Sequence, residues 1–592
     1  MSIIGIGTKI VDLRPSVGSG SGGGGGLDPA AFVTEWTVGA GDTIKLYSFD
    51  ATPSGFTMDY DVDWGDGDSD SNVTTADKTH TYSSAGTYQV VITNQFGSLN
   101  MGRASATEQS YLTNMVQWGT DNIWSSLYRM FKNCTLMEYT ATDFPNLTAL
   151  VEKTDAREMF YDCESVVNLD LSNWTNTANI TYLYYTFGQM NALKTLNLTG
   201  WDVSNVTYAV NCCGYAGSLV DGCEFIMPDL EWGTGGAVVG NFFFNSKVKS
   251  IDVSGWDFGG ANTQLSAFFR NTTKGSSGAA FSIDASGWQN SSNITSLSNF
   301  ARDTETTSIN ISGIDTQNIT NMNYMCYYAD ELTHITGLDE FDATSLTTAL
   351  IMFQHSKKYN WGTANANFGS NWGPNLGNVT TMTSWFYSTG GTTPGTAPVN
   401  VSDWDVSNVT DMSQMFRDAD WTGGQSIDVS SWDVSSVTGT GFSNWCRGST
   451  GVTSLDTSSW QISSSVTSMY YFSYASALTG DIDFSHASCD LSGITTWNGA
   501  FSTTGITGFK LHASSSFAAV TTMTNFSIYG STLISKTDYD ALLLRLAATA
   551  TNTGVTLTVA NSNYTLGGAV ETARDTTLIA GRSWTINDDG GV

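Results

Sequence analysis

The chain repeats one short phrase along most of its length, and this repeat restricts the possible folds more than any other feature. Six-residue runs from "LDLSNW" to "LDTSSW" close at Trp174, Trp201, Trp256, Trp288, Trp404, Trp432 and Trp460. Degenerate copies place Ile314, Phe341 and Cys489 at the same point. The copies recur at intervals of roughly 24 to 32 residues, which is typical of solenoid proteins.

A second apolar anchor follows the first after about twelve residues, within the solenoid period. These anchors are Phe187, Phe268, Phe300, Cys326, Phe353, Phe416, Phe472 and Phe501. Counting from Trp118 and Phe131 gives about fourteen copies between residues 111 and 530, enough for a solenoid. One copy cannot bury its own anchors, whereas stacked copies share a core. We therefore expect the tryptophans and the phenylalanines, Phe416 and Phe472 among them, inside a solenoid.

Each copy has two parts with different periods. In "SIDVSSW" apolar residues alternate, which predicts a strand with one buried face. In "NVTDMSQMF" the apolar residues fall on one helical face, at Val409, Met412, Met415 and Phe416. Each copy is therefore predicted to run strand, turn, short helix and return.

The phrases "LDLSNW" and "WDVSNVTDMSQMF" resemble BspA-like leucine-rich-repeat surface proteins, and the likeness extends through residues 111–530. The resemblance implies a leucine-rich-repeat-type parallel β solenoid with a surface or adhesive role. It brings no catalytic residues.

Before the repeat, residues 1–17 are interpreted as an N-terminal docking peptide and residues 18–26 as a Gly-rich tether. Short alternating strands follow over residues 27–105. Their "DWGDGD" turn and "HTYSSAGTYQVVIT" run resemble the polycystic-kidney-disease (PKD) family of immunoglobulin-like β-sandwiches, through Trp64, Gly65, Asp66, Gly67, His80, Tyr82, Gly86, Tyr88 and Val90. That resemblance implies a spacer or adhesion module.

After the repeat, residues 531–592 change pattern. "TDYDALLLRLAAT" and "GGAVETARDTTLIA" are typical of helices, and "GVTLTVA" and "SWTIND" of strands. The segment resembles the closing unit of such repeats. The fold expected overall is mainly β with short helices: an immunoglobulin-like sandwich, a parallel β solenoid over residues 106–530, and a small α/β cap over residues 531–592.

The charge excludes some functions. The formal net charge is −31, with 55 Asp and Glu against 24 Lys and Arg, so the surface repels nucleic acids and anionic membranes. No apolar run reaches the roughly 18 residues that span a bilayer. The start of the sequence lacks the basic segment of a signal peptide, and the first cysteine, Cys134, comes too late for a lipoprotein anchor. We expect neither nucleic-acid binding nor membrane insertion.

The eight cysteines follow the repeat, so we interpret them as small core residues rather than as a disulfide or metal framework. The densest acidic group is a weak Ca²⁺ candidate, formed by Asp59, Asp61, Asp63, Asp66, Asp68 and Asp70. It lacks the Gly and Glu spacing of a calcium loop, and solvated strand-and-turn acids are the alternative. No other cofactor is expected.

Two polar residues recur with the repeat. Aspartate follows the tryptophan-type anchor at Asp202, Asp257, Asp315, Asp342, Asp405, Asp433 and Asp490. This column is explained either by bonds to backbone N–H groups in a turn or by a bound calcium ion or substrate. The triplets at Asn179, Asn205, Asn293, Asn318, Asn378 and Asn408 match a glycosylation sequon. Their fixed place instead favours asparagine side chains that bond backbone from copy to copy.

The sequence does not predict an enzyme. Glycoside cleavage needs two carboxylates on opposite sides of one bond, and no pair stands out from the periodic ones. None of the five histidines recurs with a serine or cysteine in an activating arrangement. The receptor-contact candidates are aromatic: Tyr161 and Tyr387 directly follow phenylalanine anchors, and Tyr328 and Tyr474 fall in the slot of Asp418. Stacking between copies is the alternative role.

The expected function is that of a non-catalytic bacteriophage virion protein, a fibre, spike or decoration, which presents an adhesive solenoid on the virion surface. Residues 1–17 would dock on a capsid or tail protein, and the solenoid would bind a host-surface glycan or protein. A bacterial cell-surface adhesin is the first alternative, and a phage polysaccharide depolymerase is the second. The receptor, the oligomeric state and head or tail location are left open.

Overall fold

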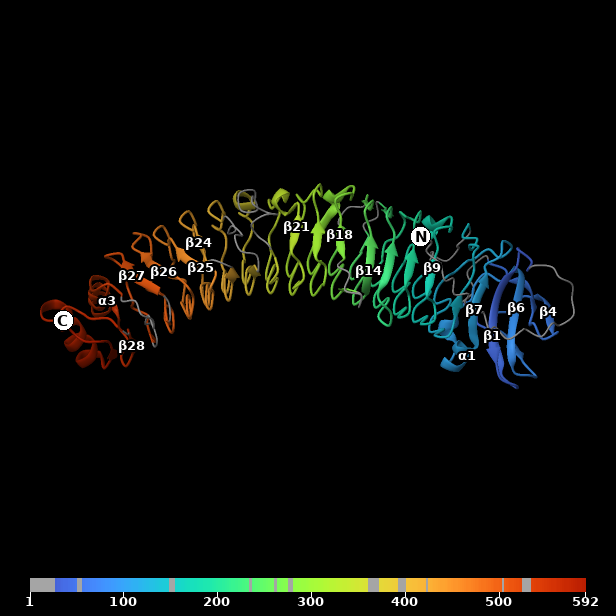
Figure 1. Ribbon diagram of the computed structural model, residues 1–592, viewed down its shortest axis with the longest axis horizontal. Coiled ribbons are helices and arrows are strands. Elements are labelled where there is room, and N and C mark those ends of the chain that lie inside the picture. The colour runs from blue at the N-terminus through green and yellow to red at the C-terminus, as the bar shows by residue number, and fades with distance from the viewer. Residues whose placement is uncertain are drawn as a thin grey trace, which may run out of the picture.

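The computed structural model describes residues 27–49, 56–148, 155–233, 237–259, 263–274, 281–359, 372–391, 401–421, 424–502, 505–523, 534–559 and 561–592. They form a curved rod, with antiparallel strands at the N-terminal end, stacked coils through the middle and helices at the C-terminal end (Figure 1). The coils form a parallel β solenoid of about 15 turns. The solenoid expected from the repeat is confirmed. The docking peptide and tether of residues 1–26 lie outside the described residues.

The N-terminal end is a six-stranded sheet in the order β4-β3-β6-β1-β7-β8, beside a two-stranded ribbon of β2 and β5. The strands are β1 Phe32–Val38, β2 Thr43–Leu46, β3 Asp59–Asp63, β4 Ser69–Val73, β5 Lys78–Thr81, β6 Gly86–Gln95, β7 Leu112–Gln117 and β8 Glu138–Tyr139. β6 pairs antiparallel with both β1 and β3. The alternation that predicts strands in residues 27–105 therefore corresponds to real strands.

Strand β7 joins the two parts of the molecule. It pairs antiparallel with β1, where Thr34 lies opposite Met115, and parallel with β8, where Asn114 lies opposite Glu138. One sheet thus changes from antiparallel pairing to the parallel pairing of the coils. The N-terminal strands and the first coil share main-chain hydrogen bonds.

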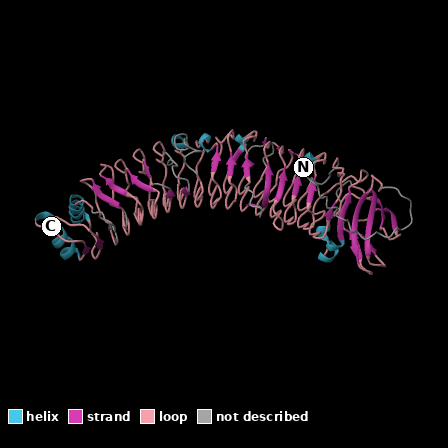
Figure 2. Ribbon diagram, in the orientation of Figure 1, coloured by secondary structure: helices cyan, strands magenta, loops and turns pink. Residues whose placement is uncertain are grey.

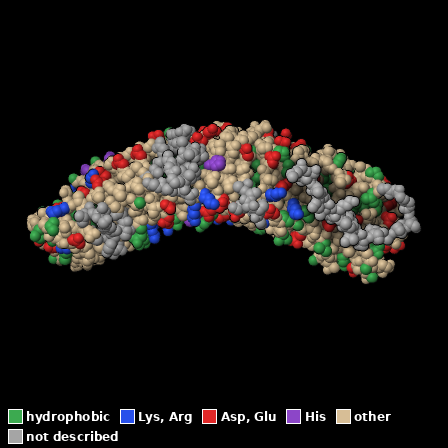
Figure 3. Space-filling view, in the orientation of Figure 1, with side chains coloured by type: hydrophobic (Ala, Val, Ile, Leu, Met, Phe, Trp, Pro, Cys, Tyr) green, Lys and Arg blue, Asp and Glu red, His purple; other side chains and the backbone are tan. Residues whose placement is uncertain are grey.

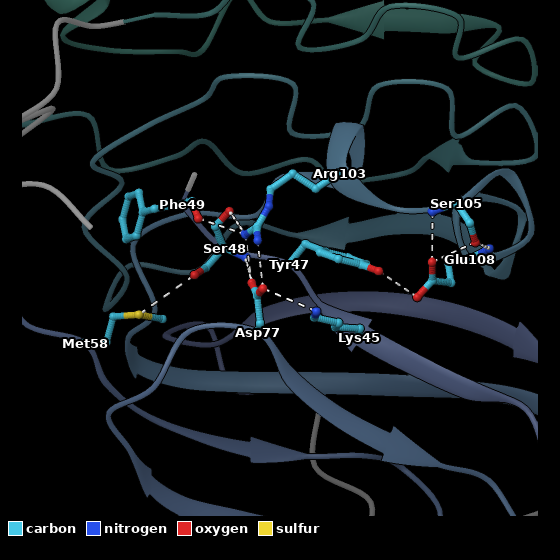
Figure 4. A network of polar contacts seen from close by, with 9 residues as sticks. All are labelled: Lys45, Tyr47, Ser48, Phe49, Met58, Asp77, Arg103, Ser105 and Glu108. Carbon is cyan, nitrogen blue, oxygen red and sulfur yellow. Dashed lines mark hydrogen bonds and ion pairs between the residues drawn. The ribbon is translucent and has the colours of Figure 1, made fainter. Parts of the chain in front are cut away.

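A polar network holds the segment that leads into β7 (Figure 4). The 3₁₀ helix η1 (Met101–Arg103) carries Arg103, which donates to the carbonyl of Phe49 at 2.8 Å and pairs with Asp77 at 2.8 Å. In helix α1 (Ala106–Tyr111), Glu108 accepts from the hydroxyl of Tyr47 at 2.8 Å and from the N–H of Ser105 in a capping box. These contacts fix the entry to the solenoid.

The solenoid strands are short and pair in parallel from coil to coil. They are β9 Asn168–Asp170, β10 Thr195–Asn197, β11 Asp202–Val203, β12 Cys223–Ile226, β13 Glu231–Trp232, β14 Lys247–Asp252, β15 Asp257–Phe258, β16 Thr263–Gln264, β17 Thr273–Lys274, β18 Ser282–Asp284, β19 Ile294–Ser296, β20 Ser308–Asn310, β21 His334–Thr336, β22 Gly390–Gly391, β23 Asp420–Trp421, β24 Gln425–Ile427, β25 Val452–Leu455, β26 Thr479–Phe484 and β27 Gly505–Leu511. Leu169, Leu196 and Phe225 occupy one register position in successive coils, and all three are buried. The period-two pattern of the sequence marks this buried face correctly.

Loops and turns make up most of each coil, as the pink segments of Figure 2 show. The short 3₁₀ helices of the coils are η2 Thr177–Asn179, η3 Ser291–Asn293, η4 Leu338–Glu340 and η5 Gly373–Asn375. The helix predicted for "NVTDMSQMF" is wrong, because Asp411 makes a parallel bridge to the preceding coil and the residues from Ser413 onward form turns. Gln414 and Asp418 adopt left-handed backbone conformations, with φ of 58° and 50°, which a right-handed helix excludes.

The hydrogen bonds explain why turns replace the helix. Gln414, Phe416 and Asp418 donate their N–H groups to carbonyls of the next coil at 2.7 to 3.1 Å. The intervening Arg417 donates to the carbonyl three residues before it, at 3.2 Å. In a helix the N–H groups beyond the first turn bond within the segment, whereas here alternate N–H groups bond to the neighbouring coil. The apolar anchors still face inward.

The interior is one continuous hydrophobic core, in which aromatic rings of neighbouring coils pack on one another. All nine predicted core residues are 4% exposed or less: Trp174, Trp201, Trp256, Trp288, Trp404, Trp432, Trp460, Phe416 and Phe472. Trp404 and Trp432 stack with ring centroids 6.2 Å apart and planes 8° apart. Indole N–H groups also reach back to the preceding coil, as from Trp201 to the carbonyl of Leu171 at 2.9 Å. Neighbouring copies therefore bury one another's aromatic anchors.

The cysteines belong to this interior. All eight are buried and free of disulfides. Burial raises the pKa of the Cys489 thiol to about 12, and it also raises the thiol pKa values of Cys134, Cys163, Cys213, Cys223, Cys326 and Cys446, so these thiols stay protonated. They occupy core positions, as the sequence predicts.

The C-terminal end carries α3 (Lys536–Thr549), α4 (Gly568–Glu571), the π-helical segment η6 (Thr572–Ala580) and the parallel strands β28 (Thr556–Thr558) and β29 (Thr585–Asn587). Each coincides with a predicted helix or strand, and only α3 extends beyond its prediction, by Lys536. A bridge from Met523 to Leu557 extends the parallel pairing into this end. Among the described residues, no helix combines the length and hydropathy needed to cross a membrane.

Candidate functional site

The turns with left-handed residues place one residue of each coil in an outer column, with glycine at two of its positions, Gly188 and Gly214. Its register follows from backbone hydrogen bonds: Asn271 donates to the carbonyl of Arg302, Asp303 to that of Tyr327, and Tyr328 to that of Gln354, at 2.7 to 2.9 Å. The same bond recurs between successive coils from Asn133 to Ser502. Most coils have two left-handed positions four residues apart, as at Gln414 and Asp418. The residues that directly precede the second of these positions therefore lie side by side along the rod.

We call the aromatic and basic members of this column the aromatic–cationic column. They are Lys132, Tyr161, Phe244, Arg270, Arg302, Tyr327, Tyr387, Arg417, Arg447 and Tyr474. All ten are partly exposed. The column gathers five of the 24 basic residues of an acidic chain.

Each cation of the column lies over an aromatic ring of a neighbouring coil. The Lys132 ammonium lies 5.1 Å from the Tyr161 ring centroid, and the Arg417 guanidinium 4.7 Å from that of Tyr387. Matching distances are 5.4 Å for Arg270 over Phe244, 5.0 Å for Arg302 over Tyr327 and 5.7 Å for Arg447 over Tyr474. Cation–π contacts of this kind contribute about 0.5–1 kcal/mol each at exposed sites. They hold the rings in place without burying them.

The four tyrosines proposed as receptor contacts all lie on this face. Tyr161, Tyr387 and Tyr474 belong to the aromatic–cationic column, and Tyr328 follows it directly at a left-handed position with 41% of its surface exposed. The slot predicted for Tyr474 is wrong. The N–H of Gly448 donates to the Tyr474 carbonyl, which aligns Tyr474 with Arg447, and Ala475 takes the slot of Asp418. In that coil the phenylalanine anchor, Phe472, lies two residues before the column position, whereas Phe501 of the following coil lies one residue before it.

Tyr328 continues into a second stack. Its ring lies 4.3 Å from that of His355 with planes 21° apart, and His355 lies 5.3 Å from Tyr387. Burial, followed by the nearby Lys357, lowers the pKa of His355, so its imidazole is neutral at pH 7. The three rings form an aromatic surface across three successive coils, in which the Tyr387 ring is tilted by 46° from that of His355. Such a surface suits contact with another flat or apolar face.

The acidic group of the N-terminal strands is dispersed rather than convergent. Asp61 accepts from the N–H of Asn72 at 2.7 Å, and Asp70 accepts from Trp64 and from Lys78. Asp59, Asp63 and Asp68 are exposed. The acids thus serve strands and turns.

Among the described residues, the one group with metal-ligand spacing is Asp66, Asp68 and His80. There His80 Nε2 already lies 2.8 Å from Asp66 Oδ2 and stacks on Trp64. Burial opposes ionisation of Asp66, but the His80 contact and the Asp68 N–H lower its pKa. An imidazole is a poor ligand for Ca²⁺, which prefers oxygen.

The aspartates that follow the tryptophan-type anchors form turns. An Oδ1 accepts from the N–H two residues on, at 2.9 to 3.2 Å, in Asp202, Asp315, Asp342, Asp405, Asp433 and Asp490. Asp257 instead accepts from the Asn290 side chain. The hydrogen bonds support the turn explanation for this column.

A second column of turn-forming side chains was not anticipated. It comprises Asp170, Asn197, Asp252, Asp284, Asn310, Asp428, Asp456 and Asp483, each accepting the N–H two residues on at 2.8 to 3.2 Å. The signal was present in the sequence, because an Asp or Asn often stands four residues before the anchor. Apart from Asp257, the periodic carboxylates of both columns therefore accept hydrogen bonds from backbone N–H groups in turns.

The asparagines of the triplets bond from coil to coil. Each side-chain amide donates to a backbone carbonyl of the preceding coil at 2.6 to 2.9 Å: Asn179, Asn205, Asn293, Asn318, Asn378 and Asn408. The backbone role expected from their fixed place is confirmed. These bonds add an asparagine ladder to the main-chain pairing.

Uncharged polar side chains and backbone make up much of the remaining surface. Figure 3 shows most of the visible face as neither hydrophobic nor charged, with acidic and basic side chains interspersed. The aromatic–cationic column is therefore a distinct chemical feature, with ring faces and guanidinium groups aligned along the rod and interrupted at Gly188, Gly214 and Gln354. It can bind planar, apolar or anionic groups.

Comparison with known proteins identifies a family for the repeat. A family model described as "Mycoplasma protein of unknown function, DUF285" matches residues 99–221, 263–396 and 392–510, which is more than half of the chain. No curated protein matches the chain, and no solved structure matches it. The matched segments cover most of the coils and the aromatic–cationic column. The chain belongs to the DUF285 family.

Proposed function

We propose that this chain is a non-catalytic binding protein, a bacteriophage virion fibre, spike or decoration, whose solenoid binds a glycan or protein of the host surface. The observation that carries the proposal is the aromatic–cationic column, a regular outer row of tyrosine and arginine on a long rod. Tyrosine and arginine are the residues most enriched where binding energy concentrates in interfaces.

Three finer assignments belong to the same proposal. The repeat is a BspA-like leucine-rich repeat, the N-terminal strands are a PKD-like immunoglobulin-like sandwich, and residues 531–592 are an α/β cap. The sandwich assignment is supported by the stacked rings of Trp64 and His80, 4.8 Å apart, and by the Tyr82 hydroxyl, which donates to the Trp64 carbonyl at 3.0 Å. These are motif residues of the resemblance.

The attachment role of the N-terminus rests on the sequence. The glycine run of residues 18–26 suits a flexible tether, and residues 1–17 are the proposed contact with a capsid or tail protein. Mass spectrometry of purified virions should detect the chain. Its presence on intact cells and absence from virions would contradict the virion assignment.

The leading alternative is a bacterial cell-surface adhesin. The family match favours it, because the family is described from Mycoplasma proteins. The depolymerase alternative is distinguished by its product: the purified chain would release reducing sugar from host polysaccharide.

The binding proposal is tested with labelled full chain and intact host cells. Replacing Arg417 or Arg447 by alanine should weaken cell binding at least about fivefold, because exposed interface arginines often contribute more than about 1 kcal/mol. Lys536→Ala, at the C-terminal end, is the control and should leave binding unchanged. Equal binding by the wild type, both arginine variants and the control would overturn the role of the column.

A further inference from the structure

A shallow hollow of about 330 Å³ lies on the solenoid surface near its N-terminal end, and four side chains line it: Arg157, Tyr182, Tyr184 and Tyr208. It is distinct from the aromatic–cationic column. Tyr182 and Tyr208 occupy one register position in neighbouring coils, joined by a parallel bridge. Tyr184 lies two residues further along its coil.

The three rings form tilted walls. The Tyr208 ring makes an angle of 47° with both Tyr182 and Tyr184, at centroid distances of 6.4 and 5.8 Å. Tyr184 is braced by an edge contact with Tyr185 at 4.7 Å. The rings are therefore splayed rather than stacked on one another, and each is partly exposed to solvent.

The charge of the lining is already neutralised. Arg157 pairs with Asp155 at 2.6 Å, and its guanidinium also lies over the rings of Tyr128 and Tyr182, at 5.2 and 5.5 Å. The adjacent Glu158 pairs with Arg129 and Lys132. A charged ligand would gain little here, because it would compete with these pairs.

The hydroxyl groups are available. Those of Tyr182, Tyr184 and Tyr208 make no hydrogen bond to any described residue of the chain, and each can both donate and accept. The hollow thus offers apolar ring faces together with free hydroxyls. A pyranose presents the same two features, apolar C–H faces and a rim of hydroxyls.

We propose that this hollow is a binding site for a neutral pyranose, the terminal hexose or N-acetylhexosamine of a surface glycan. The inference rests on the proposed function and names its ligand class. The tyrosine faces stack on the sugar ring, their hydroxyls bond its hydroxyls, and Arg157 positions the Tyr182 ring. No bond is made or broken.

Saturation-transfer difference NMR on the full chain tests the site, with the methyl glycosides of glucose, galactose, mannose, N-acetylglucosamine and N-acetylgalactosamine as probes and N-acetylneuraminic acid as the acidic comparison. We expect transfer to the ring protons of at least one neutral sugar. Tyr184→Ala and Tyr208→Ala should reduce that signal at least about fivefold. Tyr184→Phe should keep most of it, because the stacking face remains.

Tyr470→Ala is the matched control, since it removes an exposed tyrosine of another coil that lies outside the aromatic–cationic column, and circular dichroism checks the fold of every variant. Transfer to no neutral sugar, transfer to the acidic sugar alone, or equal signals in the wild type and the Tyr184 and Tyr208 variants would overturn the site. Host-cell binding that survives loss of sugar binding would overturn this inference alone. Sugar binding without any cell binding would overturn the proposed function alone.

Discussion

At the scale of the residue, the left-handed positions are the most unusual feature of the coils. Two recur in most coils, four residues apart, and asparagine fills many of them, as at Asn133, Asn211, Asn245 and Asn271. Asparagine and glycine accept this conformation at the lowest cost, whereas other L residues pay roughly 1–2 kcal/mol. The frequent asparagine at these positions is therefore explained by its low cost in the left-handed conformation.

One coil places alanine where its neighbour has glycine. Ala475 has φ of 55°, and Gly448 holds the equivalent position of the preceding coil with φ of 68°. Ala475→Gly should raise the free energy of unfolding by about 0.5–1 kcal/mol, because it relieves the left-handed strain. Chemical denaturation measures the change. Ala477→Gly, in the same coil at an ordinary backbone position, should lower stability, and stabilisation by both variants would contradict the explanation.

The asparagine ladder gives a second prediction. Asn318→Ala should lower the free energy of unfolding by about 0.5–1.5 kcal/mol, since it removes the bond to the Ser292 carbonyl, 2.8 Å long. Asn318→Asp should cost more at pH 7, because a carboxylate oxygen would then face that carbonyl. Urea unfolding midpoints of the two variants decide the order. A smaller loss of stability for Asn318→Asp than for Asn318→Ala would contradict the role of the Asn318 amide as a hydrogen-bond donor.

Single residues also mark the limit of sequence reasoning. Trp201 and Trp432 could be placed in the core, because a repeated aromatic anchor has few other uses. The slot of Tyr474 could not, because the anchor comes one residue earlier in that coil and only the hydrogen-bond register reveals the shift. The tyrosine hollow was missed because Tyr182, Tyr184 and Tyr208 meet across two coils.

At the scale of the element, strands were predictable and the helix was not. Alternation along "SIDVSSW" is a property of extended backbone and survives in the structure. The spacing of Met412, Met415 and Phe416 also satisfies a segment that turns every few residues, so the pattern alone cannot separate the two. The difference lies in where the N–H groups go, which depends on the neighbouring coil.

The network around η1 and α1 predicts a dependence on pH. Burial opposes ionisation of Asp77, but hydrogen bonds from Arg103 and the Ser48 N–H hold its pKa below the ordinary value. A lowered carboxyl pKa stabilises the fold above the unfolded-state pKa, about 3.9, and this stabilisation is lost as pH falls through the folded value. Asp77→Asn should therefore melt below the wild type at pH 7, and the gap should close below about pH 4.

Thermal unfolding between pH 7 and pH 3 measures that gap. Asp121→Asn serves as the comparison, because Asp121 is exposed and lies outside the network. A gap for Asp77→Asn that stays constant across the range would contradict the linkage.

At the scale of the whole molecule, the rod predicts unusual dimensions. A compact chain of 592 residues has a radius of gyration of about 25 Å. About 15 coils at roughly 4.8 Å each span about 70 Å before the two ends are added. Small-angle X-ray scattering should give a radius of gyration of about 30 Å or more and the scattering profile of a rod. A value near 25 Å would contradict the extended solenoid.

The architecture as a whole was the most predictable level. The repeat has a period in the solenoid range and two apolar anchors in each copy. Because no copy can bury its anchors alone, the copies must stack. The junction was not predictable, since a boundary at residue 105 treats the N-terminal strands and the solenoid as separate units. The pairing of β7 with both β1 and β8 depends on contacts that no local pattern records.

That pairing determines how the two ends can move. A linker would let the rod swing freely, whereas here a hinge motion between the N-terminal strands and the first coil must first break main-chain bonds of β7. Load applied at the far tip is carried through the coils into the N-terminal sheet as shear along paired strands. A force on a ligand bound to the solenoid would therefore reach the N-terminal sheet through the paired strands. Because β7 pairs with both β1 and β8, this connection would resist bending as well as stretching.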